Sequence, residues 1–167
     1  MSDRFVAILM GSDSDLPQMQ PAIDTLAKFD IRTEVKVTSA HRTPQATHDY
    51  VTSAEERGCA VFIAGAGMAA HLAGAVAANT TKPVIGVPIN ASLEGLDALL
   101  ATVQMPGGIP VATVAIGKAG AKNAAYLSAQ ILAIADNDLA ERVKMERAES
   151  ARAVEAKDAA LQAKLAQ

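Results

Sequence analysis

Two adjacent residues, His41 and Arg42, carry the side chains best suited to chemistry in this sequence. An imidazole gains and loses a proton near neutral pH, so His41 is a candidate general acid or base. The guanidinium of Arg42 is a permanent cation that binds phosphate, and the hydroxyl of Ser39 lies close by in the sequence. Pro44 suits the first turn of a helix, so we expect the pair on a strand-to-helix turn. The alternative is that His41 and Arg42 are solvent-exposed residues without a function. Their position on a strand-to-helix turn favours a functional role, because binding and catalytic residues are often found on such loops.

A second polar loop, residues 11–15, follows the first apolar run of the chain. Gly11 permits a tight turn, and Ser12, Ser14 and Asp15 stand just before an expected helix. Backbone N–H groups at the start of a helix attract anions, which makes this loop a candidate ligand site. A purely structural role fits equally well, because Ser14 or Asp15 can cap the helix.

A third loop, residues 65–71, has no carboxylate. Gly65 and Gly67 allow a ligand to approach the backbone closely. The local sequence favours a core histidine at His71, bonded to a backbone carbonyl. The loop differs from a dinucleotide-binding fingerprint, since Ala70 replaces the third glycine and no ribose-binding acid follows about twenty positions later.

Five short apolar runs and the helical patterns between them must position these loops. Strands are predicted at residues 5–10, 33–38, 60–64, 83–87 and 111–116, and helices at 16–29, 44–57, 69–79, 93–103 and 119–135. Thr43 is the expected N-cap of the second helix. Such alternation with short connections predicts an α/β three-layer sandwich around a five-stranded parallel sheet of flavodoxin-like order 2-1-3-4-5. The three loops then meet at one edge of the sheet, beyond the carboxyl ends of the strands.

The 167 residues form one α/β domain, residues 1–136, followed by a helical extension, residues 137–167. From position 136 onward the chain has seven acidic and six basic residues and no Gly or Pro, which is typical of one long helix. Val143, Val154, Leu161 and Leu165 fall on one side of it. We expect this helix to pack partly on a neighbouring subunit, with loose final turns.

Composition excludes several classes of partner. A net charge of −3, 3% aromatic residues and no Trp argue against a nucleic-acid surface. The uncharged stretch of residues 59–78 is interpreted as strand, turn and helix, so no membrane partner is expected. The single cysteine, Cys59, suits a reducing, cytoplasmic location. No metal site is expected either, because the histidines are scattered and one Cys cannot form a thiolate cluster.

The loops and two later segments together resemble a known family. The stretches MGSDSD, SAHRTP, AGAGMAAHLAG, VQMPGGIPV and AIGKAGAKNAA resemble those of the 5-(carboxyamino)imidazole ribonucleotide mutases, in the phosphoribosylaminoimidazole carboxylase catalytic subunit family of purine biosynthesis. The likeness runs from about residue 5 to residue 136. It implies a homo-oligomer, typically an octamer, that acts on a small ribonucleotide without ATP, metal or any other cofactor.

The resemblance also implies a role for each matching residue. Ser12 and Asp15 would contact the substrate, with Asp15 at the ribose. Ser14, Ser39 and Arg42 would hold the 5′-phosphate and His41 would be the general acid and base. The pocket for the migrating carboxylate would be lined by Gly65, Ala66, Gly67, Ala70, His71 and Leu72.

The implied reaction moves a carboxylate from an exocyclic nitrogen to the neighbouring ring carbon, through loss and recapture of carbon dioxide. His41 would remove the surplus proton from that carbon. An apolar Gly/Ala pocket would hold carbon dioxide by excluding water. The sequence departs from the family at Met68, where Gly is usual, and at Ala73, where Pro is usual.

Three rival interpretations are weaker. A carboxylase of the same family would use carbon dioxide directly. A phosphoacceptor receiver domain needs an Asp at the end of the third strand, where this chain has Ala64 and Gly65. A flavodoxin-like binding module rests on fold analogy alone, and the loops lack the aromatic side chains that would stack on a flavin.

Overall fold

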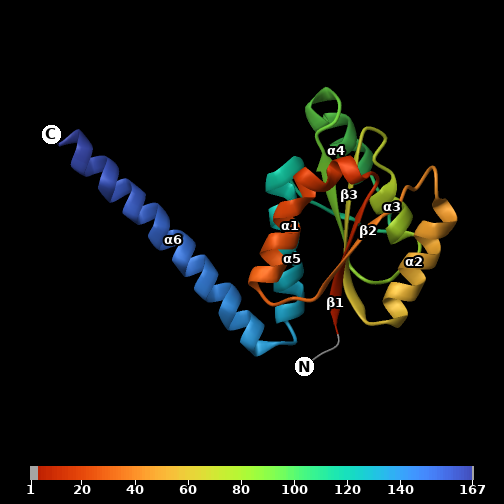
Figure 1. Cartoon of the computed structure of the whole chain (residues 1–167), viewed down its shortest axis with the longest axis horizontal. Helices are drawn as coiled ribbons and strands as arrows, with labels where there is room; N and C mark the ends of the chain where they lie inside the picture. Colours follow the sequence, from red (N-terminus) through yellow and green to blue (C-terminus); the bar gives the residue numbers. More distant parts are fainter. Residues whose placement is uncertain (1–3, 167) are drawn as a thin grey trace. The chain divides into compact units, whose positions relative to one another are not determined.

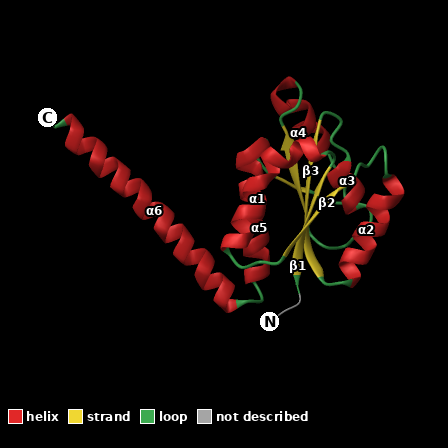
Figure 2. Ribbon diagram, viewed as in Figure 1, coloured by secondary structure: helices red, strands yellow, loops and turns green. Residues whose placement is uncertain are grey.

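A sheet of five parallel strands forms the centre of the protein, in a computed structural model that describes residues 4–166 (Figures 1 and 2). The strand order is β2-β1-β3-β4-β5, as the sequence predicts. The strands are β1 (Phe5–Met10), β2 (Thr33–Val37), β3 (Cys59–Gly67), β4 (Val84–Ile89) and β5 (Ala112–Thr113). The helices are η1 (Asp13–Asp15), α1 (Leu16–Lys28), α2 (Pro44–Glu56), α3 (Leu72–Ala77), η2 (Leu93–Gly95), α4 (Leu96–Val103), α5 (Gly117–Ala133) and α6 (Asn137–Leu165).

Helices cover both faces of the sheet, which is why its inner strands are apolar on both sides. β1 and β4 are buried along their whole length. Figure 1 shows α1 and α5 on one side of the sheet, and α2 and α3 on the other. On the α2–α3 side, Phe5 and Phe62 from the strands pack in one cluster with Val51, Leu72 and Val76 from the helices. The predicted three-layer α/β sandwich is therefore confirmed.

Two compact units make up the chain, Met1–Ser128 and Ala129–Gln167. The second contains α6, where Asp136 is the N-cap and its carboxylate accepts the N–H of Leu139 at 2.9 Å. The long C-terminal helix is thus present, and Val154, Leu161 and Leu165 are each more than half exposed on it. No helix within residues 4–166 is both long enough and apolar enough to cross a membrane.

Several element boundaries differ from the predicted ones, for reasons specific to each segment. β3 continues through Gly67 because Ala66 and Gly67 still pair with β4, so the third loop begins later than predicted. The fifth strand shrinks to Ala112–Thr113, which pairs with β4 at two positions only. The helix predicted at 69–79 is only Leu72–Ala77, and α4 begins at Leu96 after a turn in which Leu93 and Glu94 have positive φ.

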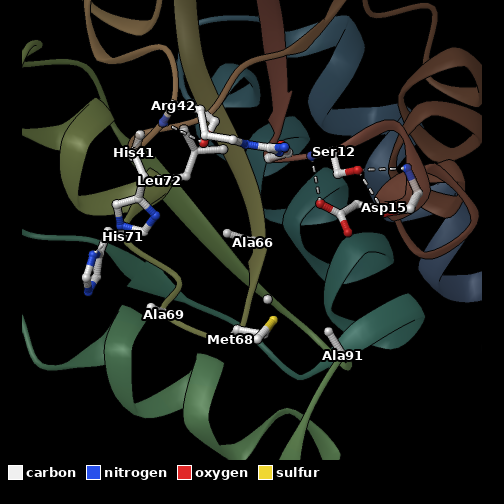
Figure 3. Close-up of a pocket in the computed structure, with 15 residues that line it drawn as sticks. Ser12, Asp15, His41, Arg42, Ala66, Met68, Ala69, His71, Leu72 and Ala91 are labelled. Carbon is white, nitrogen blue, oxygen red and sulfur yellow. Dashed lines mark hydrogen bonds between the residues drawn. The ribbon is translucent and has the colours of Figure 1, made fainter.

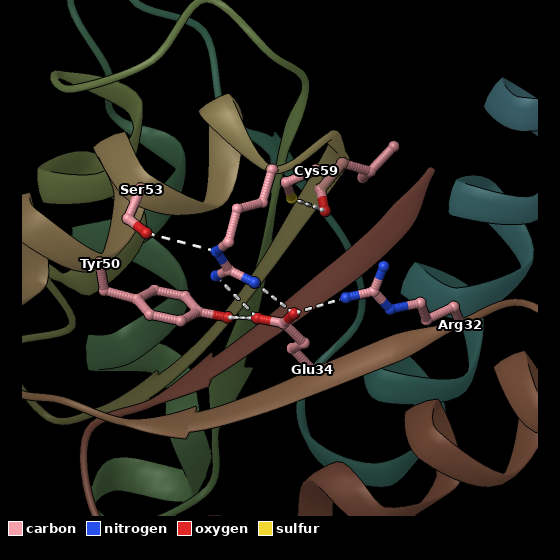
Figure 4. A network of polar contacts seen from close by, with 7 residues as sticks. Arg32, Glu34, Tyr50, Ser53 and Cys59 are labelled. Atoms are coloured by element: carbon pink, nitrogen blue, oxygen red, sulfur yellow. Dashed lines mark hydrogen bonds and ion pairs between the residues drawn. The ribbon is translucent and has the colours of Figure 1, made fainter. Parts of the chain in front are cut away.

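A polar network ties the edge strand β2 to helix α2, the two elements on either side of the segment that carries His41 and Arg42 (Figure 4). The carboxylate of Glu34 in β2 accepts hydrogen bonds from both terminal nitrogens of Arg57, one of them at 2.9 Å. It also accepts from the Tyr50 hydroxyl at 3.2 Å and from Arg32 at 3.1 Å. The hydrogen bond from Arg57 is the main reason that the pKa of Glu34 lies below its usual value.

Replacing Glu34 with glutamine is expected to lower the melting temperature by about 2 °C at pH 7 and low salt, because the pair is largely solvated. A carboxyl whose pKa is lowered by folding stabilises above its unfolded pKa, and this contribution disappears as the pH falls through the folded value. The difference between wild type and Glu34→Gln should therefore shrink as the pH falls through the pKa of Glu34 in the folded protein, which lies below its usual value. Thermal melts between pH 2 and pH 8 measure it, and a difference that persists at low pH would contradict it.

Candidate active site

One cavity of about 460 Å³ lies at the carboxyl ends of the strands, where the three predicted loops meet (Figure 3). The loops after β1, β2 and β3 all contribute to its wall, and Ala91 adds the loop after β4. Its lining residues are Gly11, Ser12, Ser14, Asp15, Ser39, Ala40, His41, Arg42, Ala66, Gly67, Met68, Ala69, His71, Leu72 and Ala91. The predicted convergence at one edge of the sheet is thus confirmed.

The first loop is shaped by a capping box around η1. The Ser12 hydroxyl accepts the N–H of Ser14 at 3.3 Å, and the Asp15 carboxylate accepts the N–H of Ser12 at 3.1 Å. Ser12 is therefore the cap of η1, whereas Asp15 occupies the N-cap position of α1, as the sequence allowed, but makes no side-chain capping bond there. The Ser14 hydroxyl lies 2.9 Å from that of Ser12, so two hydroxyls share one wall of the cavity. Burial raises the pKa of Asp15, while the hydrogen bond from Ser12 partly opposes the rise.

The second loop holds Arg42 over the first. The Arg42 guanidinium donates to the backbone oxygen of Gly11 at 3.2 Å, while its backbone N–H donates to the Ser39 hydroxyl at 3.1 Å. Thr43 occupies the N-cap position, but its hydroxyl accepts the N–H of Ser39 at 2.9 Å and makes no capping bond to α2. The expected cap thus stabilises the loop instead. The result is a permanent cation that lines the same cavity as the hydroxyls of Ser12 and Ser14.

The two histidines of the cavity face each other. Nε2 of His41 lies 2.7 Å from Nδ1 of His71, and the rings meet edge to face with centroids 4.8 Å apart. One of these nitrogens must carry the proton that the other accepts, so the contact fixes one tautomer of each ring. The sequence favoured a buried His71 bonded to a carbonyl, and that prediction is wrong. His71 is exposed in the cavity wall because α3 begins after it.

Two residues of the third loop that the resemblance assigned to the pocket lie outside its wall, namely Gly65 and Ala70. A side chain at Gly65 would come within 2.5 Å of the Met19 sulfur, so this glycine makes room for α1. Ala70 is 1% exposed, so it is buried and does not line the cavity. Ala66, Gly67 and Leu72 do line the cavity, as expected.

Residues that sequence reasoning missed complete the wall. Ala40, Ala69 and Ala91 line the cavity although none was assigned a role, and Met68, where the sequence departs from the family, lines it too. Gly67 approaches Ala91 so closely that a Cβ at position 67 would lie 2.9 Å from the Ala91 Cβ. The signal for Ala91 was its place after the fourth strand, at the same edge as the other loops.

Met68 has a backbone conformation that is unusual for a residue with a side chain. Its φ is +55°, in the left-handed region, which costs roughly 1 kcal/mol or more for a residue other than glycine. The side chain is 61% exposed at the rim of the cavity. Four residues in the described part of the chain share a positive φ without being glycine, and Met68 is the one that lines the cavity.

Other reactive side chains lie elsewhere. His48 on α2 bonds to the Asn79 side chain at 2.7 Å and does not line the cavity. Cys59 is buried, which raises the pKa of its thiol to about 11 and keeps it protonated at neutral pH. Within residues 4–166, no group of three or more His, Cys, Asp or Glu side chains is arranged to hold a metal ion.

The cavity therefore combines three kinds of surface. Arg42 with the serine hydroxyls suits a phosphate group. The imidazole of His41, held by His71, suits proton transfer. The wall of alanine, glycine, Leu72 and Met68 suits an apolar fragment and has no carboxylate of its own. Together they fit a phosphorylated substrate that exchanges a proton and a small uncharged group.

Comparison with known proteins agrees with this arrangement. The family model described as AIR carboxylase matches residues 5–153. N5-carboxyaminoimidazole ribonucleotide mutase from Bacillus subtilis (strain 168) is 55% identical over 143 residues, which cover 85% of this chain and 88% of that protein. The enzyme of the same name from Mycobacterium tuberculosis (strain H37Rv) is 54% identical over 158 residues, covering 94% and 90%.

Solved structures give the same result for the fold. The crystal structure of Treponema denticola PurE superposes with a TM-score of 0.84 at 30% identity, covering 93% of this chain and 97% of that one. The matched region includes the sheet and every loop of the cavity. This chain therefore belongs to the AIR carboxylase family.

Proposed function

We propose that this protein is an isomerase of purine biosynthesis, an N5-carboxyaminoimidazole ribonucleotide mutase. It moves the carboxylate of 5-(carboxyamino)imidazole ribonucleotide from the exocyclic nitrogen to carbon 4 of the ring. The observation that carries the proposal is the meeting of the His41–Arg42 turn with an apolar, carboxylate-free wall in one cavity. Relatives that carry this name at about 55% identity support it.

The polar side of the cavity binds the ribotide. Arg42, Ser14 and Ser39 hold the 5′-phosphate, since a guanidinium with two hydroxyls matches its charge and its acceptor oxygens. Asp15, anchored by the backbone of Ser12, accepts hydrogen bonds from the ribose hydroxyls. Fixing both ends of the sugar phosphate leaves the imidazole ring at the Ala/Gly wall, beside His41.

His41 acts first as an acid and then as a base. As the imidazolium it donates a proton to the exocyclic nitrogen while the bond from that nitrogen to the carboxylate breaks, which leaves an amine and carbon dioxide. Carbon 4 attacks the carbon dioxide and then carries both a carboxylate and its original proton. The now neutral His41 removes that proton, so the enzyme returns to its starting state. The facing His71 holds the ring of His41 in one orientation throughout.

The apolar wall prevents the intermediate from escaping. Carbon dioxide has no charge and is a weak acceptor, so residues such as Ala66, Gly67 and Leu72 hold it by excluding water. A carboxylate in this wall would repel the group as it regains its charge.

A carboxylase that takes up carbon dioxide directly is the alternative, favoured by the description of the family model. A spectrophotometric turnover assay distinguishes the mutase from the carboxylase. The enzyme is given either the carbamate substrate or aminoimidazole ribonucleotide with bicarbonate, and the two rates are compared. A strong preference for the carbamate supports the mutase. Equal or better turnover with bicarbonate would refute it in favour of the carboxylase.

Replacing Arg42 with alanine is expected to raise KM for the phosphorylated substrate about 100-fold, because a charge-assisted phosphate contact is lost. The value of kcat should change much less, since the phosphate is distant from the reacting bond. Arg42→Lys is the matched control, because lysine keeps the positive charge but lacks the bidentate geometry of the guanidinium. Its KM should lie between those of wild type and Arg42→Ala. Steady-state kinetics measure both constants, and an unchanged KM in Arg42→Ala would refute the phosphate assignment.

We also propose a cytoplasmic homo-octamer in which residues 1–136 form the catalytic domain and residues 137–167 pack on a neighbouring subunit. The exposed Val154, Leu161 and Leu165 of α6 offer a surface for this packing. Light scattering on the purified full chain should give eight times the chain mass of 17.2 kDa. A monomeric mass would refute the assembly.

A further inference from the structure

Met68 stands out among the residues that line the cavity. The rest of its neighbourhood in the wall consists of Ala66, Gly67, Ala69 and Ala91, so the Met68 thioether is the largest apolar group there. Figure 3 shows its sulfur turned toward the space between the segment of Ala66 and that of Ala91. The Met68 side chain is highly exposed and also lines the cavity, so it lies at the mouth of the apolar part of the cavity.

The backbone around Met68 is fixed on both sides. On one side, the preceding residue, Gly67, is packed against Ala91 too closely to admit a Cβ. On the other side, the oxygen of Met68 accepts the N–H of Ala70 at 2.9 Å, and that of Ala69 accepts the N–H of His71 at 2.8 Å. These contacts hold the positive φ of Met68 in place. The strained conformation therefore directs a side chain to the mouth of the cavity, where glycine would fit without strain.

The chemistry of a methionine side chain suits a movable apolar cover. It is unbranched and has three rotatable bonds, so it can swing aside for a substrate and then settle over a small group. The thioether is a weak acceptor and has no donor, so it attracts water poorly. Alanine at this position would be too short to cover the wall formed by Ala66 and Ala91.

From this geometry we infer that Met68 retains carbon dioxide during the reaction by covering the apolar wall after the carbon–nitrogen bond has broken. The inference rests on the proposed mutase activity. It states that Met68 determines how much of the carbon dioxide is recaptured by the ring and how much is lost to solvent. Met68 touches the migrating group but transfers no proton, so it is a specificity-determining residue. Shortening it should release more carbon dioxide and more free aminoimidazole ribonucleotide.

The test uses the full chain with unlabelled carbamate substrate in buffer that contains ¹³C-bicarbonate and carbonic anhydrase. Mass spectrometry then measures the ¹³C content of the product carboxylate and the amount of free aminoimidazole ribonucleotide, each corrected with an enzyme-free sample. Wild type should incorporate little label per turnover. Met68→Ala and Met68→Gly should both incorporate about 10-fold more, and Met68→Leu, which keeps an apolar side chain of similar size, should stay within twofold of wild type.

Two truncations separate the side chain from the backbone. Met68→Gly removes the backbone strain, so its melting temperature should equal or exceed that of wild type, and Met68→Ala keeps the strain. The matched control is Met145→Ala on α6, at a methionine that is 62% exposed and does not line the cavity; it should change nothing. The inference would be overturned if Met68→Ala and Met68→Gly both incorporated no more ¹³C than wild type. It would also be overturned if Met68→Leu incorporated as much ¹³C as these two variants. Failure of wild type to convert the carbamate would overturn the proposed function instead.

Discussion

Replacing His41 with asparagine is expected to lower kcat by about 10³-fold, while the protein stays folded and still binds its substrate. General acid–base catalysis by one positioned side chain contributes roughly 10² to 10⁴ in rate. His41 carries out both proton transfers of the proposed reaction, so the loss of kcat should lie near the middle of that range or above it. The side chain is exposed in the cavity and contacts His71 rather than the core, so its removal should cost little stability.

The matched control for His41→Asn is His48→Asn. Both histidines are exposed and close in the sequence, but His48 lies on α2, bonds to Asn79 and takes no part in the cavity wall. Substrate turnover, ligand titration by calorimetry and a thermal melt should be measured on both variants. Full activity in His41→Asn would remove the residue from the mechanism, and a comparable loss in His48→Asn would point to damage of α2.

Much of the fold could be predicted from the sequence, because a parallel sheet leaves a strong local pattern. Buried strands such as Phe5–Met10 are apolar at every position, and Pro44 marks the start of α2. The short connections indicate a parallel sheet, which brings the loops to one edge, and analogy with other small five-stranded sheets suggests the strand order that the structure shows. The sites of Ser12, Ser39 and Arg42 in the cavity wall then follow from their positions directly after strands.

What the sequence could not predict depends on distances between residues far apart in the chain. The partner of His71 is His41, thirty positions earlier, and a local pattern could only suggest a core histidine. The glycines of the third loop look alike in the sequence, but Gly65 makes room for the Met19 side chain while Gly67 makes room for Ala91. The role of each glycine is set by its neighbour in space.

Gly120 near the start of α5 supplies the second large effect. A Cβ added at this position would lie 1.6 Å from the backbone oxygen of Ala115 and 2.6 Å from its carbonyl carbon. A clash with backbone cannot be relieved by a side-chain rotation, so either α5 or the turn before it must move. Gly120→Ala is therefore expected to destabilise the protein by roughly 3 kcal/mol or more, and to lower the melting temperature by about 10 °C.

The displacement should reach the active site through a short chain of contacts. Gly117 at the start of α5 approaches the side-chain oxygen of Gln18. That oxygen accepts the backbone N–H of Asn90 at 3.1 Å, and the side-chain nitrogen of Gln18 donates to the backbone oxygen of Asn90. Asn90 precedes Ala91 of the cavity wall. A shift of α5 thus loosens that wall, so Gly120→Ala should lose activity well below its melting temperature.

Gly107→Ala is the matched control for Gly120→Ala, because nothing lies within 4 Å of its added Cβ and its φ is not in the left-handed region. Its melting temperature should change by no more than about 2 °C. Thermal melts and turnover at 25 °C should be compared for the two variants. If Gly120→Ala melts like Gly107→Ala, the close approach of α5 to Ala115 does not constrain the fold. Loss of both stability and turnover in Gly120→Ala alone would show that the helix start and the cavity wall are mechanically linked.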